Sequence, residues 1–183
     1  MGLLFLPPAL CGHDGCQSLK EIDKIFSNIY QSWDSKTFHS IINYFELPFT
    51  NAIKTFSRGM RMKTALSIAL AHDTRLLILD EATAGMDVSG REHVLEILED
   101  YLGDDRAILI SSHISEDIEQ LATQLVFMRD GRIILKESKE ILLSQYGIID
   151  QPVEHFNISN EYLIATRRRN DRQISLVNNY QKV

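Results

Sequence analysis

The stretch that decides the fold is Arg75–Asp87, with the sequence RLLILDEATAGMD. Four apolar residues, Leu76–Leu79, come directly before two adjacent acids, Asp80 and Glu81. An unbroken apolar run of this length is typical of a strand buried on both faces, as in a parallel sheet. Ligands of α/β proteins bind at the carboxyl ends of such strands. The stretch therefore predicts an α/β fold with both acids at the ligand-binding edge of the sheet.

The two acids have a functional and a structural interpretation. Neighbouring carboxylates at the end of an apolar strand are unfavourable unless a cation lies between them or one of them acts as a base. In the functional interpretation this is a Walker B segment: Asp80 would hold Mg²⁺ through water, and Glu81 would orient and polarise the water that attacks a nucleoside triphosphate. The alternative is a strand that ends in a solvated acidic turn. These residues alone do not decide between the two.

Three further segments accompany the acids. FSRGM (Phe56–Met60) leads into a predicted helix over Arg61–His72. AGMD (Ala84–Asp87) follows the acids, and SSH, which ends at His113, closes a second apolar strand over Ala107–Ser112. Four such segments in this order across roughly 60 residues are more specific than any one of them.

In these four segments the chain resembles ABC-type ATPases. FSRGM is similar to the LSGGQ signature of that family, LLILDE to its Walker B segment, AGMD to its D-loop and SSH to its switch-histidine loop. The sequence of these segments resembles most that of the ATPase subunits of bacterial exporters of peptides and antibiotics. The resemblance implies a partial P-loop NTPase sheet with flanking helices and a helical subdomain, with ATP and Mg²⁺ as cofactors.

The resemblance also implies roles for individual residues. Glu81 would be the catalytic base, His113 the switch that contacts the γ-phosphate, and Asp80 the Mg²⁺ partner. In the family, the signature loop binds the γ-phosphate of ATP held by the opposite subunit, and Asp87 in the D-loop would sit at the dimer seam and help join the two sites. The nucleotide-binding residues implied here are Ser57, Arg58, Gly59, Met60 and Asp87.

Each of these residues also has a simpler interpretation. Ser57 alone would be an ordinary helix cap, and His113 a structural residue at a strand end. Asp87 would cap the next helix, Val88–Leu102. Arg58 replaces the family's first glycine, and it would either add a cation near the nucleotide or point to solvent.

One motif of the family is absent from the sequence, which contains no G-x-x-x-x-G-K-[ST] and no Gly-Lys pair. That phosphate loop supplies an N–H cradle, a lysine and a hydroxyl ligand for Mg²⁺. We therefore expect an amino-terminally truncated domain that is inactive alone. In the family the phosphate-loop strand lies beside the strand that ends at His113, so its loss should leave unpaired backbone and exposed apolar surface. By the resemblance, Gly2–Phe5 is the strand before the Q-loop, and Leu6 stands near the usual glutamine.

Composition limits the other classes of function. The 183 residues suit one main globular domain, and the net charge of −6 argues against nucleic-acid binding. No apolar run reaches the ~18–20 residues of a membrane span, and Met1–Leu10 has no positive leader and is interrupted by Pro7–Pro8. We expect a cytoplasmic protein held on the inner face of the membrane by a partner. Cys11 and Cys16 lack a second ligand pair, so we expect incidental thiols rather than a zinc site.

The order of predicted elements gives the expected domains. Residues 1–150 would be the carboxyl-terminal portion of an ABC ATPase domain, with a helical subdomain over about 17–72 and the core over about 73–150. Residues 151–183 would be a small appendage. Local signals predict helices capped by Ser18 and by Asp34 or Ser35, a hairpin turned at Asp130–Gly131, a helix closed by Gly147, and strands over Tyr162–Thr166 and Gln173–Val177.

The sequence therefore leads to one main hypothesis and two rivals. The main hypothesis is an ATP-hydrolysing subunit of an ABC exporter, incomplete in this chain, that works with a membrane subunit and pairs with another ATPase subunit. The first rival is a non-catalytic partner that docks on a complete ATPase and regulates it. The second is a DNA-repair or chromosome-structuring ATPase head, which would need long coiled-coil heptads, and none is visible.

Overall fold

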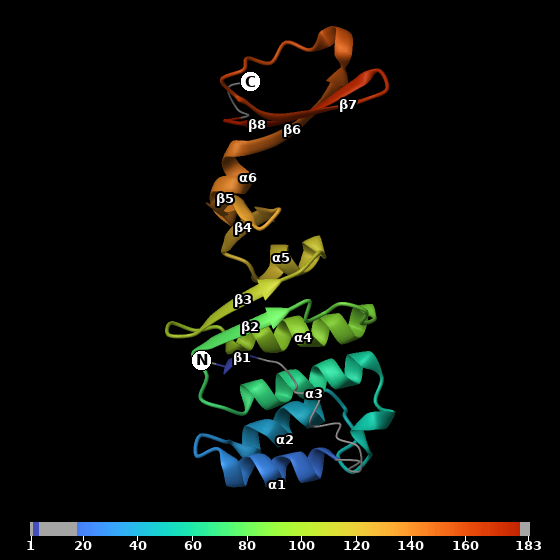
Figure 1. The fold of residues 1–183 in the computed structure, drawn as a ribbon, viewed down its shortest axis with the longest axis vertical. Coiled ribbons are helices and arrows are strands. Elements are labelled where there is room, and N and C mark those ends of the chain that lie inside the picture. The colour runs from blue at the N-terminus through green and yellow to red at the C-terminus, as the bar shows by residue number, and fades with distance from the viewer. Residues whose placement is uncertain (1, 4–17, 180–183) are drawn as a thin grey trace. The chain divides into compact units, whose positions relative to one another are not determined.

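The computed structural model describes residues 2–3 and 18–179 (Figure 1). The chain divides into two compact units, Met1–Leu121 and Ala122–Val183, which are considered separately. Strand β6 (Tyr146–Pro152) crosses position 150, where the sequence suggested the end of the ATPase portion. That boundary concerns which residues belong to the ATPase domain, and it stays a prediction. The suggested Q-loop position, Leu6, and the two cysteines lie outside the described residues.

The first unit is built on a parallel sheet whose strands are ordered β1 (Gly2–Leu3), β2 (Leu76–Asp80) and β3 (Ala107–Ser111). Among the described residues, β3 pairs with β2 alone, and Leu109 on β3 is 59% exposed. Helix α4 (Val88–Tyr101) connects β2 to β3. The α/β architecture predicted from the sequence is therefore present, with β3 as an edge strand in this part of the chain.

Three helices precede the sheet strand β2. They are α1 (Leu19–Ile29), α2 (Ser35–Tyr44) and α3 (Arg58–Leu70), and a short 3₁₀ turn, Ile53–Thr55, stands before α3. The predicted cap at Ser18 is confirmed, because its hydroxyl accepts the Glu21 N–H at 3.3 Å and the Glu21 carboxylate accepts the Ser18 N–H at 2.8 Å. Figure 1 shows α4 beside β2, with α3, α2 and α1 following in turn away from the sheet.

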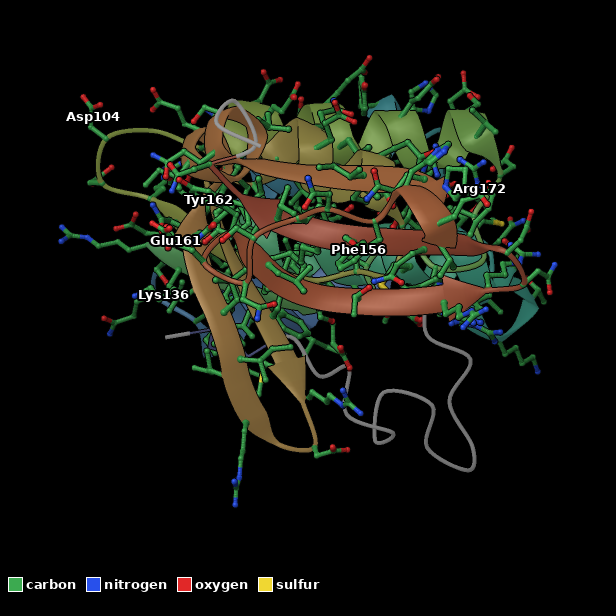
Figure 2. The ribbon with its side chains drawn as sticks, turned by 90° about the horizontal axis from the view of Figure 1, so that it is seen from above. Asp104, Lys136, Phe156, Glu161, Tyr162 and Arg172 are labelled. Carbon is green, nitrogen blue, oxygen red and sulfur yellow. The ribbon has the colours of Figure 1, made fainter. Side chains whose placement is uncertain are left out.

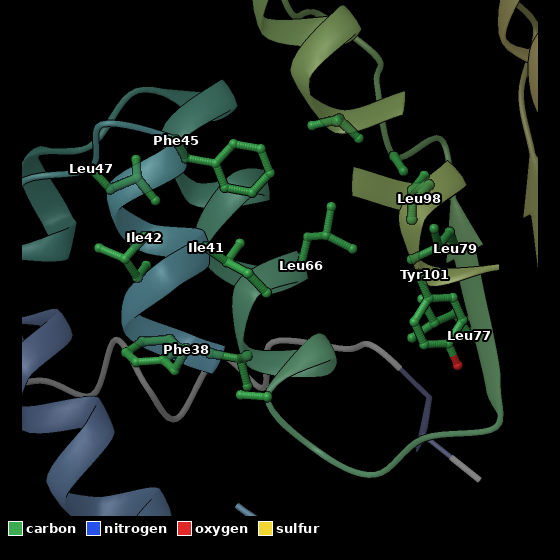
Figure 3. Packing of buried hydrophobic residues seen from close by; sticks show 14 of the residues in the cluster. Phe38, Ile41, Ile42, Phe45, Leu47, Leu66, Leu77, Leu79, Leu98 and Tyr101 are labelled. Carbon is green, nitrogen blue, oxygen red and sulfur yellow. The ribbon is translucent and has the colours of Figure 1, made fainter. Parts of the chain in front are cut away.

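A single apolar cluster joins these helices to the sheet. The apolar residues of α2 are almost completely buried, and Figure 3 shows Ile41 beside Leu66 of α3. On the sheet side, Leu77 and Leu79 of β2 meet Leu98 of α4. The labelled residues of α2 and the turn after it are Phe38, Ile41, Ile42, Phe45 and Leu47. This cluster sets the position of β2 and therefore of the acids that follow it.

The predicted helix over Arg61–His72 needs two corrections. Helix α3 begins three residues earlier, at Arg58, because Ser57 serves as its cap and accepts the Met60 N–H at 3.2 Å. Gly59 and Met60 therefore lie in the first helical turn rather than ahead of it. The helix ends at Leu70, with Ala71 as its C-cap.

His72, the last residue of the predicted helix, lies two residues beyond the end of α3 and is half-buried. Its ring makes edge contacts with Tyr30 at 4.7 Å and Trp33 at 5.1 Å between ring centroids. Burial lowers the pKa of His72, which disfavours the cationic form. His72 is therefore a packing residue that joins the end of α3 to the end of α1.

The second unit contains a hairpin, a helix and a second sheet. Strands β4 (Gln124–Arg129) and β5 (Arg132–Ser138) pair antiparallel, and the Asp130–Gly131 turn has φ values of 50° and 73°, as the turn signal predicts. Helix α6 (Lys139–Gln145) follows directly. Strands β6, β7 (Leu163–Arg169) and β8 (Arg172–Asn178) form an antiparallel sheet in the order β6-β8-β7. A 3₁₀ turn, Val153–His155, lies between β6 and β7 in the chain.

One prediction in the second unit is wrong. Gly147 does not close a helix but lies inside β6, where it pairs with Val177 of β8. The two predicted strands, by contrast, are present as β7 and β8, and the pairing of β6 with β8 accounts for the missed strand. Arg172 at the start of β8 donates from Nε to the Asp150 carboxylate at 2.8 Å, and Figure 2 shows it near one end of this sheet.

Candidate functional site

The two acids leave the sheet through an unusual backbone conformation. Asp80 is the last residue of β2, and Glu81 directly after it has φ 51°, in the left-handed region that residues other than glycine rarely adopt. Such a residue costs roughly 1–2 kcal/mol relative to ordinary backbone. The Glu81 N–H donates to both the carbonyl and the hydroxyl oxygen of Ser111, each at 3.1 Å. The end of β3 therefore holds the strained turn that presents Glu81.

Glu81 contacts the histidine at the end of the second strand. Its Oε2 lies 2.6 Å from Nδ1 of His113, and the side chains are 39% and 71% exposed. A carboxylate bonded to Nδ1 fixes the orientation of the imidazole and leaves Nε2 on the other side of the ring. Because both groups are partly exposed, this pair adds little to stability. The pair places a carboxylate and an imidazole side by side at one edge of the sheet.

Asp80 joins the same group through Ser111. The Ser111 hydroxyl donates to Oδ1 of Asp80, so this one serine holds both the Asp80 side chain and the Glu81 backbone. The residues that the structure describes contain no cluster of three or more His, Cys, Asp or Glu that could hold a metal by themselves. Mg²⁺ commonly binds one or two carboxylates and completes its shell with water and substrate phosphates. An exposed Asp80 at a strand end fits that mode of binding.

The signature segment lies against the D-loop. A Cβ placed on Gly59 would be 3.7 Å from Cγ of Met86, and one placed on Gly85 would be 3.4 Å from Nη1 of Arg58. Gly85 has φ 76°, a conformation that favours glycine. The first N–H groups of α3 have no carbonyl partner within the helix, so this end attracts anions. Arg58 is exposed, and its guanidinium packs on the Gly85 turn, which leaves both interpretations of Arg58 open.

Asp87 stands at the N-cap position of α4, although its side chain makes no capping hydrogen bond. The carboxylate instead folds over the helix, where a Cβ on Gly90 would be 2.6 Å from Oδ1 of Asp87 and 3.7 Å from Nζ of Lys63. The helix begins at Val88, as the sequence predicts. The close approach explains why position 90 carries a glycine.

The predicted site residues therefore form two groups in the first unit. Asp80, Glu81 and His113 meet at the carboxyl edge of β2 and β3. The signature residues Ser57 to Met60 pack beside the D-loop that ends at Asp87. This grouping is the one expected if the signature and D-loop serve a different nucleotide from the one that the acids and His113 face.

Sequence reasoning missed a buried polar cluster behind the acids. It consists of Thr83, Arg91, Ser112 and Asp117. One signal was available: Asp117 stands four residues before the buried Leu121 on α5 (Ser115–Leu121), so both lie on one face of that helix. An acid on the inward face of a helix needs a polar partner. The sequence suggested only that Asp117 belongs to an acidic first turn.

Comparison with known proteins shows similarity to ABC transporter ATP-binding proteins. The ABC transporter family matches residues 11–84. The chain is similar to the lantibiotic transport ATP-binding protein SrtF of Streptococcus pyogenes, with 36% identity over 116 residues, covering 63% of this chain and 47% of SrtF. It is also similar to the ABC transporter ATP-binding protein YtrB of Bacillus subtilis, with 31% identity over 115 residues, covering 62% of this chain and 39% of YtrB. The chain thus spans less than half the length of these curated relatives.

The solved structures agree on the fold. The dimeric structure of a post-hydrolysis state of the ATP-binding cassette MJ0796, bound to ADP and Pi, superposes with a TM-score of 0.60 at 18% identity, covering 75% of this chain and 62% of that chain. No helix among residues 18–179 is long and apolar enough to cross a membrane. The α/β architecture, the order of the four segments and these similarities agree: residues 11–84 match the ABC transporter family, and the chain is similar to ABC transporter ATP-binding proteins.

Proposed function

We propose that this chain supplies the Walker B, switch and signature parts of an ATP-hydrolysis site in an ABC transporter that exports a peptide or antibiotic. The observation that carries the proposal is the 2.6 Å contact between Glu81 and His113 at the sheet edge beside Asp80. A relative named for lantibiotic transport supports the export of a peptide antibiotic.

The proposal gives a task to each residue of the first group. Glu81 accepts a hydrogen bond from the attacking water and polarises it toward the γ-phosphate. His113 donates from Nδ1 to Glu81, and in its doubly protonated form it also donates from Nε2 to a γ-phosphate oxygen. Asp80 would hold Mg²⁺, which when bound neutralises charge on the phosphates. Because Ser111 holds the Asp80 side chain and the Glu81 backbone, the turn that carries both acids is fixed before ATP arrives.

The second group would act on the nucleotide of another subunit. Ser57, Gly59 and Met60 present the amino-terminal end of α3 to the γ-phosphate. Asp87 would lie at the seam between the two ATPase subunits. The dimeric state of the similar cassette MJ0796 supports such a pairing. The membrane subunit of the transporter would hold this dimer at the inner face of the membrane.

The proposal predicts that the 183-residue chain alone does not turn over ATP, because its sequence contains no phosphate-loop pattern. The test uses a chimera in which the amino-terminal part of a complete ABC transporter ATP-binding protein, with its phosphate loop, is joined ahead of Ser18. Phosphate release from Mg·ATP is measured for the chain and for the chimera. We expect turnover only in the chimera.

Two other outcomes would change the proposal. Hydrolysis by the chain alone that is abolished by Glu81→Gln would contradict the need for a separate phosphate loop. A chimera with no turnover, together with a chain that binds a complete ATPase subunit and alters its rate, would favour the rival function of a non-catalytic regulatory partner. Size-exclusion chromatography of the mixture measures that binding.

A further inference from the structure

A single buried carboxylate lies behind the acids and the histidine. Asp117 on α5 is 1% exposed, and its Oδ2 accepts hydrogen bonds from the hydroxyls of Thr83 and Ser112, the latter at 3.0 Å. Thr83 stands two residues after Glu81 and is itself 1% exposed. Ser112 stands directly before His113. One oxygen atom therefore holds both loops that carry the Glu81–His113 pair.

Further hydrogen bonds make these loops stiff on both sides of the pair. The Ser112 hydroxyl oxygen accepts the Ile114 N–H at 3.0 Å, so the residues on either side of His113 are tied together. In the other loop, the Ala84 N–H donates to the Glu81 carbonyl at 3.0 Å. A change at Asp117 would thus be passed to both side chains of the pair through short, fixed segments.

The second oxygen of Asp117 links the cluster to α4. Oδ1 lies 3.7 Å from Nε of Arg91, within ion-pair range but beyond hydrogen-bond distance. Within the described part of the chain, both of these buried atoms lack a hydrogen-bond partner. Arg91 stands one turn after Asp87, and its N–H donates to the Asp87 carbonyl at 3.0 Å. The carboxylate therefore connects α5, the two catalytic loops and the first turn of α4.

Stability alone is a poor explanation for this arrangement. A buried charge with an incompletely bonded partner is commonly no better for stability than an apolar side chain of similar size. A hydrogen-bonded buried network, however, restricts its members to one arrangement. Here the members that it restricts are the neighbours of Glu81 and His113.

We propose that Asp117 is a positioning residue, which sets the contact between Glu81 and His113 by holding Thr83 and Ser112 on one carboxylate oxygen. The importance of that contact for hydrolysis rests on the proposed function, but the positioning itself does not. It can be measured in the 183-residue chain without nucleotide.

The test follows the imidazole Cε1–H signal of His113 by NMR, assigned by its loss in His113→Gln. Glu81→Gln removes the direct partner and gives the reference shift. We expect Asp117→Leu to move the His113 signal in the same direction as Glu81→Gln. Asp117→Asn retains an oxygen that can accept from both hydroxyls, so its His113 signal should stay near that of the unaltered chain.

Two variants that each remove one hydrogen bond to Asp117 keep the test decisive if Asp117→Leu does not fold. Thr83→Val and Ser112→Ala each remove one hydroxyl donor, and each should move the His113 signal partway along the same direction. Tyr101→Phe is the matched control, because it removes another buried hydrogen bond of the same unit, from Tyr101 to the Thr74 carbonyl at 2.7 Å. It should leave the His113 signal in place.

The outcomes separate the inference from the proposed function. The positioning role would be overturned if the His113 signal does not move in folded Asp117→Leu, or if it moves in neither Thr83→Val nor Ser112→Ala. This holds whatever the chimera does with ATP. A shifted signal in a protein whose chimera does not hydrolyse ATP would support the positioning role and count against the proposed function. Circular dichroism confirms which variants are folded.

Discussion

Replacing Glu81 by glutamine is expected to lower kcat of the chimera for ATP hydrolysis about 10²–10⁴-fold, the usual contribution of a general base. Glutamine has nearly the shape of glutamate but cannot take a proton from water. The carboxylate is placed for this task by the φ 51° turn and by the 2.6 Å contact with His113. Because the water is activated after ATP has bound, KM should change much less than kcat. The measurement is steady-state phosphate release over a range of Mg·ATP concentrations.

The matched control is Glu99→Gln on α4. Glu99 is exposed and lies on α4, away from the sheet edge. Glu99→Gln removes the same charge as Glu81→Gln. It should leave kcat within about twofold of the unaltered chimera, since surface substitutions away from the site have small effects. A Glu81→Gln chimera as active as the Glu99→Gln control would show that another group activates the water.

Replacing Leu98 by alanine is expected to lower the free energy of unfolding of the first unit by about 2–5 kcal/mol. Leu98 is fully buried and fills the space between α4 and β2, next to Leu77 and Leu79 (Figure 3). Truncation removes apolar contacts and leaves a cavity that neighbouring elements fill only in part. Urea unfolding followed by fluorescence measures the effect, because the single tryptophan, Trp33, lies in this unit and packs against its core.

Leu109→Ala is the matched control in the same unit. Leu109 lies on β3 and is 59% exposed, so the same truncation should change the free energy of unfolding by no more than about 0.5 kcal/mol. If both substitutions were equally costly, the outer face of β3 would have to be covered in solution. Equal and small effects would instead contradict the packing of α4 on β2.

The parts of the site that lie close together in sequence could be predicted. The apolar run Leu76–Leu79 and the acids after it indicate a strand end, and the strand that precedes His113 has the same pattern. Since the carboxyl ends of parallel strands meet at one edge, the meeting of Glu81 and His113 follows from the topology. The caps at Ser18 and Asp34 were predictable because capping depends on three neighbouring residues.

The parts that depend on tertiary contacts could not be predicted. The cluster around Asp117 joins residues up to 34 positions apart through side-chain hydroxyls, and neither Thr83 nor Ser112 has a local signal for it. The contacts of His72 could not be predicted either, because the aromatic rings that pack on it come from the end of α1 and the turn after it. Gly147 suggested a helix end, but pairing with β8 outweighs its low strand propensity.

The roles of several regions stay predictions. The arginine run of β7, Arg167–Arg169, is exposed, and a solvated turn accounts for it better than binding of an acidic partner or of lipid headgroups. Asp104, at the tip of the turn between α4 and β3, also points outward (Figure 2).

The central claim is that Glu81 and His113 act together on one ATP, and a double-mutant cycle in the chimera tests it most directly. The cycle compares kcat for Glu81→Gln, His113→Gln and the combination. Residues that act as a unit give a combined loss close to the larger single loss. We predict that result. Single losses that multiply in the double variant would show independent action and contradict the account.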